Sequence, residues 1–299
     1  MIGRLTFLAY VAGWRLVRAL PERFAAALFR RGADLAYRRQ GKGVRRLQSN
    51  LRRVLGPDAS DDELARVTKA GVRSYARYWL EVFRLPVIPP ERFLTDTTCI
   101  DEDRLKTAAK SGDGVIVALP HQGNWDAAGA WATLSGMPFT TVAERLEPEA
   151  LFDRFVAFRE SIGMEVVPLS GGEQNPFDLL AERLRAGGML CLLGDRDLTE
   201  RGIEVEFFGA ATRFPAGPAA LALRTGAALL PATLWTPERG WGIHIHEAVA
   251  VPETGSDADK IAAMTQDLAR VFEAGIRLHP EDWHMLQRLW LSDLRPVAP

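Results

Sequence analysis

From residue 100 onward, short apolar runs alternate with helical patterns, and this alternation restricts the possible folds more than any other feature of the chain. The runs have the length of buried strands, and glycine and proline residues separate them from the helical segments. Strands that alternate with helices over short connections predict a single α/β domain, with a largely parallel mixed sheet and helices on both faces. The predicted strands are residues 114–120, 138–143, 164–169, 189–193, 203–208 and 227–234.

The helices are predicted from the signals at their ends. Ser60-Asp-Asp-Glu63 has the capping-box pattern of a helix start, and Asn175-Pro176 places a capping residue before a proline in the first turn. Gly136 and Gly163 stand where two helices are expected to end. The predicted helices are residues 60–85, 125–134, 148–162, 176–186 and 256–278, and residues 241–251 alternate as expected of a late antiparallel strand.

The composition fits this fold and excludes several classes of protein. Of the 299 residues, 47% are hydrophobic and 25% are charged, which excludes a disordered chain and a disulfide-bonded miniprotein. Cys99 and Cys191 are too few for a disulfide framework and lack metal-ligand spacing. His244 and His246 lie two residues apart in a predicted strand and, without a third ligand nearby, are expected to be ordinary strand residues. We therefore expect no bound metal.

The N-terminal fifth of the chain is strongly basic. Residues 1–56 contain thirteen Lys and Arg side chains against Glu22 and Asp34, whereas the whole chain has a net charge of −1. Such a segment indicates an anionic partner, either a nucleic acid or an anionic membrane surface. The basic residues interleave with long apolar runs, and no helix-turn-helix or stacked-aromatic signature is present. These observations argue against a nucleic acid.

The first predicted helix favours the membrane surface. Residues 5–17 are apolar over most of the helix circumference, and Arg4, Arg15 and Arg18 fall on one narrow stripe. This pattern is typical of a helix that lies in a membrane interface, and a core helix with a solvated edge is the alternative. The uninterrupted apolar stretch, residues 5–14, is about half of a membrane span, and no small-residue cleavage site of a signal peptide follows it. We expect peripheral attachment to the membrane.

The motif with the clearest chemical potential is His121-Gln-Gly-Asn-Trp-Asp126, which follows the strand 114–120 and leads into a helix. In open α/β sheets the carboxyl ends of the strands face the ligand crevice. A neutral imidazole can take a proton from a hydroxyl group, and a carboxylate can orient it, so a substrate that brings its own hydroxyl needs no serine nucleophile. In the structural alternative, Asp126 only complements the helix dipole and His121 caps the helix. The sequence contains no G-x-S-x-G elbow, no Walker A loop and no G-x-G-x-x-G after a strand.

The surroundings of this motif resemble those in the lysophospholipid acyltransferase superfamily. Phe139–Arg145 is similar to the second strand and substrate block, and Gly194-Asp-Arg-Asp197 is similar to a carboxylate-bearing loop. Residues 207–228 resemble the phosphate-side block of the bacterial lipid A acyltransferase branch. Residues 14–18, 74–79, 158–163 and 282–287 resemble the actinobacterial members of that branch, which acylate phosphatidylinositol mannosides. The resemblance covers nearly the whole chain.

The resemblance implies direct transfer of a palmitoyl-like chain from acyl-CoA, as a co-substrate, to a mannose hydroxyl of a phosphatidylinositol mannoside. The reaction would take place at the cytoplasmic face of the membrane, without a further cofactor and without an acyl-enzyme. The whole chain would be one acyltransferase domain, with residues 1–90 as a membrane-docking part and residues 91–299 as the catalytic core. The alternatives are a lipid A-type acyltransferase that uses acyl carrier protein and, in a different class, a basic nucleic-acid-binding protein.

The resemblance also implies roles for individual residues. His121 would be the base and Asp126 the motif carboxylate, while Asp195 stands where the mannoside enzymes have a glutamate that partners the histidine. Which of the two carboxylates orients His121 stays open. Arg159 is either the buried partner of Asp126 or a surface residue, and Arg196 either binds phosphate or pairs with its neighbour. The candidates for substrate binding are Asn124, Trp125, Glu144, Arg145, Arg159, Arg196, Trp283 and His284.

Overall fold

The computed structural model describes residues 13–143, 156–157, 159–169, 174–197 and 201–294. Its main sheet contains β1 (Thr97–Ile100), β2 (Val115–Leu119), β3 (Phe139–Ala143), β4 (Met164–Pro168), β5 (Met189–Leu193), β8 (Ala228–Trp235) and β9 (Trp241–Ile245). The seven strands have the order β1-β9-β8-β2-β5-β3-β4. All neighbours are parallel except β8 and β9, which pair antiparallel, so the predicted α/β fold with a largely parallel mixed sheet is confirmed.

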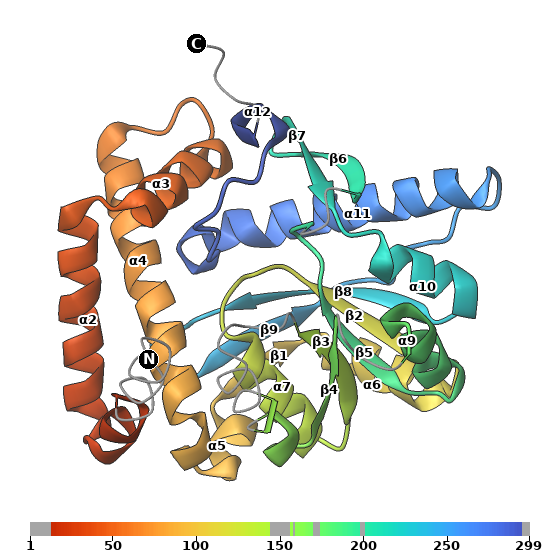
Figure 1. The fold of residues 1–299 in the computed structure, drawn as a ribbon, viewed down its shortest axis with the longest axis horizontal. Helices are drawn as coiled ribbons and strands as arrows, with labels where there is room; N and C mark the ends of the chain where they lie inside the picture. The colour runs from red at the N-terminus through yellow and green to blue at the C-terminus, as the bar shows by residue number, and fades with distance from the viewer. Residues whose placement is uncertain (1–12, 144–155, 158, 170–173, 198–200, 295–299) are drawn as a thin grey trace, which may run out of the picture.

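Helices cover both faces of this sheet, as Figure 1 shows. One face packs against α9 (Pro176–Arg185), α10 (Gly217–Thr225) and α11 (Asp257–Leu278), and the other packs against α5 (Pro90–Thr95), α6 (Glu102–Ser111) and α7 (Trp125–Leu134). Strand β2 contributes side chains to the apolar cores on both faces. Ile116 and Ala118 pack on the side of α9, α10 and α11, and Val115, Val117 and Leu119 pack on the side of α5, α6 and α7. A parallel strand buried on both faces is expected to be apolar throughout.

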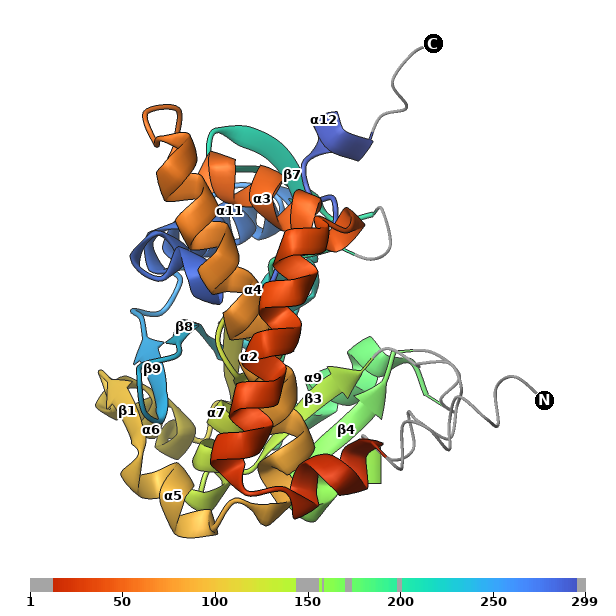
Figure 2. The same cartoon turned by 90° about the vertical axis from the view of Figure 1, so that its left-hand side faces the viewer.

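A helical layer closes one end of the sheet. It consists of α2 (Glu22–Arg39), α3 (Lys42–Leu55) and α4 (Asp61–Arg84), and Figure 2 shows α2 running beside α4. The described part of the chain also contains the short 3-10 helices η1 (Leu85–Val87) and η2 (Pro280–Asp282) and the short helix α12 (Leu291–Leu294). At the start of α4, the Ser60 side chain accepts a hydrogen bond from the Glu63 amide at 3.1 Å, as the capping pattern predicts.

One prediction about the sheet needs correction, and one strand of the main sheet was not predicted. Residues 203–208 do not join the main sheet, because β6 (Ile203–Phe207) pairs with β7 (Ala210–Phe214) in a separate antiparallel hairpin. The turn between them needs positive φ angles at Phe208 and Gly209, of 50° and 71°. Strand β1 was not predicted, since its alternately exposed residues form a short edge strand. Most of the helix predicted at 148–162 lies outside the described residues; residues 156–157 and 159–161 are helical.

The described part of the first helix buries two apolar side chains and leaves a third, Leu16, 59% exposed. Residues 13–19 are helical, and Trp14 and Val17 are buried. The Trp14 indole donates to the Phe83 carbonyl at 2.7 Å, and the Arg18 guanidinium donates to the same oxygen at 3.0 Å. The prediction that this apolar face is free to enter a membrane is therefore wrong for Trp14 and Val17, while Arg4 and residues 5–12 lie outside the described part. Among the described helices, none is both long and apolar enough to span a membrane.

Candidate active site

The His121 imidazole contacts Asp195 at the carboxyl edge of the main sheet. His121 closely follows β2, and Asp195 closely follows β5, the parallel neighbour of β2. The His121 Nδ1 atom lies 2.5 Å from Asp195 Oδ1. The choice between Asp126 and Asp195 was open from the sequence, and the structure places Asp195 against the imidazole although its side chain is shorter than that of glutamate.

Three donors hold the buried carboxylate of Asp195. Besides the imidazole, the main-chain N–H of His121 and the indole of Trp283 each donate to Oδ2 at 3.0 Å. Burial acts to raise the pKa of Asp195, but attraction to His121 and the three hydrogen bonds hold it below its ordinary value. An ionised Asp195 accepts the Nδ1 proton, so the Nε2 lone pair of His121 is left for a substrate. The His121 side chain is 26% exposed.

Asp126 forms a separate ion pair and does not orient His121. The Arg159 Nε atom lies 2.8 Å from Asp126 Oδ1, and the Tyr78 hydroxyl donates to Oδ2 at 3.1 Å. Asp126 is 3% exposed, and the Asp126 charge raises the pKa of Arg159 above its ordinary value against the effect of burial. Of the two environments expected for Arg159, the structure has the buried ion pair. This pair joins α7 to the segment before β4 and to α4.

Trp283 and His284 support the His121 loop from behind. The His284 amide donates to the His121 carbonyl at 2.8 Å, and Trp283 reaches Asp195 as described. Trp283 is completely buried and His284 is 5% exposed. Burial, with the nearby His121, lowers the pKa of His284 to about 3, so this imidazole is neutral at physiological pH. Both residues act on the loop and on Asp195, and neither lines the cavity described below.

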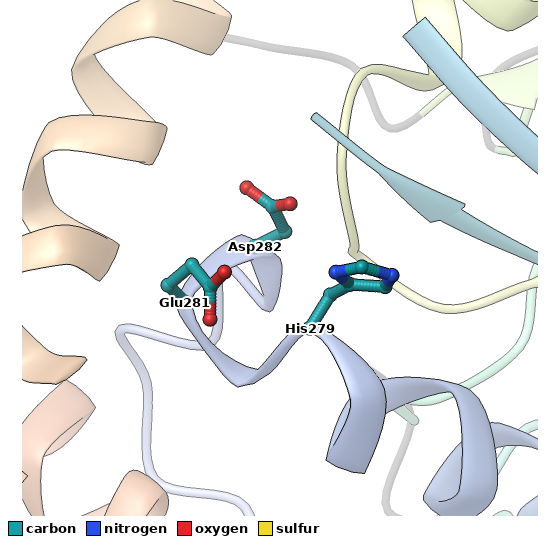
Figure 3. A group of neighbouring side chains, drawn as sticks. All are labelled: His279, Glu281 and Asp282. Atoms are coloured by element: carbon teal, nitrogen blue, oxygen red, sulfur yellow. The ribbon is translucent and has the colours of Figure 1, made fainter. Parts of the chain in front are cut away.

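The segment just before Trp283 carries three polar side chains: His279, Glu281 and Asp282 (Figure 3). Among the described residues, these three have metal-ligand atoms within 4.8 Å of one another, so the group could hold a metal ion. Asp282 is 3% exposed, and it uses its oxygens in hydrogen bonds from the Ser74 hydroxyl at 2.5 Å and the Thr236 amide at 2.7 Å. These bonds fix η2 against α4 and β8.

Asn124 and Trp125 have different environments. Asn124 is 4% exposed and is the N-cap of α7, where its side-chain oxygen accepts from the Ala127 amide at 3.0 Å. Its side-chain nitrogen donates to Glu81 at 2.7 Å, so both ends of the amide bond to protein groups. The Trp125 ring lies edge-on to His121, with ring centroids 5.7 Å apart, and lines the adjacent cavity.

A cavity of about 560 Å³ opens beside His121. Its polar lining includes His121, Arg159, Arg196 and Asp197, while most of the remaining wall is apolar. The apolar wall extends between α7 and the sheet and includes Val117, Leu119, Gly129, Trp131, Ala132, Phe139 and Met164. This size and lining suit a small molecule with a long apolar part. Glu144 and Arg145, predicted at the same edge, lie outside the described residues.

The sequence prediction missed the contribution of α4 to this site. Ser74, Tyr78 and Glu81 contact His284, Asp126 and Asn124, respectively. Their spacing of four and three residues places them on one face of α4, so polar side chains within a core-facing helical stripe were the available signal.

The site consists of a histidine that is held by a buried carboxylate and that opens to an apolar cavity. Such a site is suited to transfer of an apolar group to a substrate hydroxyl. A model of the bacterial lipid A biosynthesis acyltransferase family matches residues 1–292. The chain belongs to this family, and the resemblance inferred from its sequence blocks is confirmed.

Two similar proteins carry the name phosphatidylinositol mannoside acyltransferase. The protein from Mycolicibacterium smegmatis is 49% identical over 294 residues, which cover 98% of this chain and 93% of that protein. The protein from Mycobacterium tuberculosis H37Rv is 50% identical over 290 residues, which cover 96% of this chain and 89% of that protein. The likeness therefore extends through the N-terminal helical layer and the α/β core.

Proposed function

We propose that this protein is an acyltransferase that moves a palmitoyl-like chain from acyl-CoA to a mannose hydroxyl of a phosphatidylinositol mannoside. The observation that carries the proposal is the His121–Asp195 pair beside the apolar cavity. The names of the two mycobacterial relatives support the mannoside acceptor. A lipid A-type acceptor with acyl carrier protein as donor is the alternative within the same family.

The transfer proceeds without an acyl-enzyme. The Nε2 atom of His121 takes the proton of the mannose hydroxyl, whose oxygen attacks the thioester carbonyl. The carbon–sulfur bond then breaks, and the proton passes to the departing CoA thiolate. Asp195 stays ionised and stabilises the imidazolium that forms in between. Cys191 lines the cavity, but burial raises the pKa of its thiol well above the ordinary value, so it is a poor nucleophile.

The two ends of the donor have separate places in this scheme. The acyl chain lies in the apolar part of the cavity, between α7 and the sheet, so that its thioester is next to His121. Arg196 lines the polar part of the cavity and is our candidate for a phosphate contact. Trp125 is our candidate for contact with the acceptor, and Glu144 and Arg145 stay predictions for the same role. No metal or further cofactor has a role in this scheme.

The acceptor carries fatty chains of its own, so we infer that the protein works at the cytoplasmic face of an anionic membrane, as a peripheral protein. We propose α2 as a docking surface, because Trp14 and Val17 of the first helix are buried. Phe24, Leu28 and Leu35 are 57%, 55% and 46% exposed, and their spacing places them on one face of α2. Arg31 and Arg38 are exposed, and their helical spacing places them on the same face of α2. An apolar stripe with cationic neighbours suits an anionic bilayer.

A matrix of two donors and two acceptors tests the proposal. Palmitoyl-CoA and palmitoyl acyl carrier protein are each supplied with a phosphatidylinositol mannoside or a lipid A precursor, and the lipids are analysed by mass spectrometry. We expect acylation in the combination of palmitoyl-CoA with the mannoside. Product only with acyl carrier protein and the lipid A precursor would establish the alternative, and the absence of any product would refute acyl transfer.

A further inference from the structure

Glu81 connects three parts of the fold that meet beside the active site. Its Oε1 atom accepts from the Arg77 Nε atom at 2.6 Å, within α4. Its Oε2 atom accepts from Asn124 Nδ2 at 2.7 Å and from the Trp241 indole at 2.8 Å. The Glu81 side chain is 14% exposed, and both Asn124 and Trp241 are 4% exposed, so these bonds form largely away from water. Buried charge-assisted hydrogen bonds of this kind hold their partners firmly.

Arg77 makes this connection rigid. Beyond its bond to Glu81, its guanidinium donates to the carbonyls of Pro237 at 2.7 Å and Gly240 at 3.0 Å, in the turn between β8 and β9. Glu81 therefore has one position, fixed from its own helix and from this turn. The Asn124 amide is fixed in the same way, because its oxygen caps α7 while its nitrogen reaches Glu81.

The link ends on the loop that carries His121. Each residue of this loop has its own anchor: His121 on Asp195, the Gln122 side chain on the carbonyls of Gly275 and His279 at 3.2 and 3.3 Å, and the Gly123 amide on the Asp282 carbonyl at 2.9 Å. The bond from Asn124 to Glu81 is the anchor on the side of α4. It holds the last residue before α7, and the Trp125 ring that follows lies against the imidazole.

We propose that Glu81, acting through Asn124, is a positioning residue for His121 in the transfer reaction. Glu81 touches neither substrate nor the reacting atoms; it sets the angle at which the loop leaves the sheet and enters α7, and so holds the Nε2 atom of His121 toward the cavity. A displacement of about 1 Å at a reacting group can cost about a hundredfold in rate. This inference rests on the acyl transfer proposed above.

A set of variants separates the link from the other bonds of the same residues. Asn124→Asp keeps an oxygen to cap α7 but turns a second carboxylate oxygen toward Glu81. Asn124→Ser also keeps a cap, and it removes the link without adding charge. The double variant Asn124→Asp/Glu81→Gln restores the hydrogen bond in the opposite direction, from the new amide to the new carboxylate, and it is made in the Trp241→Phe background because the Trp241 indole N–H would otherwise face the new amide nitrogen. Trp241→Phe is the matched control, because it removes a different donor from Glu81 and leaves the link intact.

We expect kcat to fall ten- to a hundredfold in both single Asn124 variants, with the KM for palmitoyl-CoA within twofold of the parent. The double variant should regain most of the loss, and Trp241→Phe should stay within threefold of the parent kcat. A parental kcat in Asn124→Ser, or no recovery in the double variant when both fold, would overturn the inference. A loss in Trp241→Phe as large as in Asn124→Ser would indicate general loosening instead of positioning, and would also overturn it.

A structural measurement separates the test of the positioning role from the test of the proposed function, because it does not depend on activity. Crystal structures of the parent and of Asn124→Ser should differ at residues 121–124, with a lengthened contact between His121 and Asp195 in the variant. If the parent transfers no acyl group to any acceptor, the proposed function fails by itself. An unmoved loop in Asn124→Ser would refute the positioning role whether or not the parent is active.

Discussion

Of two isosteric substitutions, Asp195→Asn should mainly lower activity, and Asp126→Asn should mainly lower stability. In Asp195→Asn the amide oxygen can still accept from the His121 amide and the Trp283 indole, so the local packing is kept. The amide nitrogen then faces His121 Nδ1 as a donor and favours the tautomer that carries its proton on Nε2. A base in the wrong tautomer cannot accept the hydroxyl proton, and we expect a loss in kcat of about 10³- to 10⁴-fold.

Asp126→Asn removes the charge that balances Arg159. Loss of one member of a buried ion pair typically costs about 3–5 kcal/mol, and the 19% exposure of the Arg159 side chain favours the lower end of that range. For a chain of this size, a loss of about 3 kcal/mol corresponds to a fall in Tm of roughly 5 °C. Activity measured well below the new Tm should fall less than in Asp195→Asn, because the contact between His121 and Asp195 is intact.

The assay combines thermal unfolding with the initial rate of CoA release, measured on the same preparations. Asp195→Asn should keep a Tm within about 3 °C of the parent and lose activity, while Asp126→Asn should show the large shift in Tm. Equal shifts in Tm for the two variants, with activity following stability, would refute this division of roles.

Three further predictions follow from other parts of the structure. The double variant Phe24→Ser/Leu28→Ser should be released from phosphatidylinositol-containing vesicles at low salt in a sedimentation assay. Leu278→Ser, at a 72% exposed position of α11, is the control and should stay bound. Equal binding by the parent, the double variant and Leu278→Ser would exclude α2 as the docking surface. Gly129→Ala should shift the preferred acyl-CoA to shorter chains, because the added Cβ meets Met164 at 2.5 Å and Phe139 at 2.9 Å in the cavity wall. Gly32→Ala is the control: its added Cβ has nothing within 4 Å, so the preference should stay unchanged. An unaltered chain-length profile in Gly129→Ala would place the acyl chain elsewhere. Burial lowers the pKa of His284 from 6.5 to about 3. Between these two pH values the unfolded chain binds a proton that the native protein does not. The free energy of unfolding should therefore fall by up to about 1.4 kcal/mol per pH unit as the pH drops below about 6.5. His284→Gln should lose this part of the slope in urea titrations at pH 4–7, and an unchanged slope would contradict the buried neutral imidazole.

Most of the main sheet could be predicted from the sequence because its inner strands are buried on both faces. An apolar run such as Val115–Leu119 is visible without knowledge of its neighbours, and glycines and prolines mark the helix ends. The partner of a strand is set by contacts that are distant in sequence. For that reason the apolar pattern of Ile203–Phe207 identified a strand but not the separate hairpin that contains it.

The candidate site divides in a similar way. The motif and the order of the sequence blocks identified His121 and Asp195 as candidate site residues. Both follow strands whose carboxyl ends meet at one edge of the sheet. The division of roles between Asp195 and Asp126 depends on where Arg159 and Tyr78 lie, and these come from other segments. The link from Glu81 to Asn124 spans 43 residues, and neither side chain has a pattern that names the other as its partner.

The central claim is that His121 is the base of an acyl transfer, and single-turnover transfer by His121→Ala tests it most directly. Parent or variant enzyme, in excess over radiolabelled palmitoyl-CoA, is mixed with this donor and with a phosphatidylinositol mannoside in vesicles. Circular dichroism confirms that the variant is folded. The account predicts that the parent forms labelled acyl-mannoside lipid and that the variant forms it at a rate lower by at least a hundredfold. Transfer by the folded variant at more than a tenth of the parent rate would contradict the account.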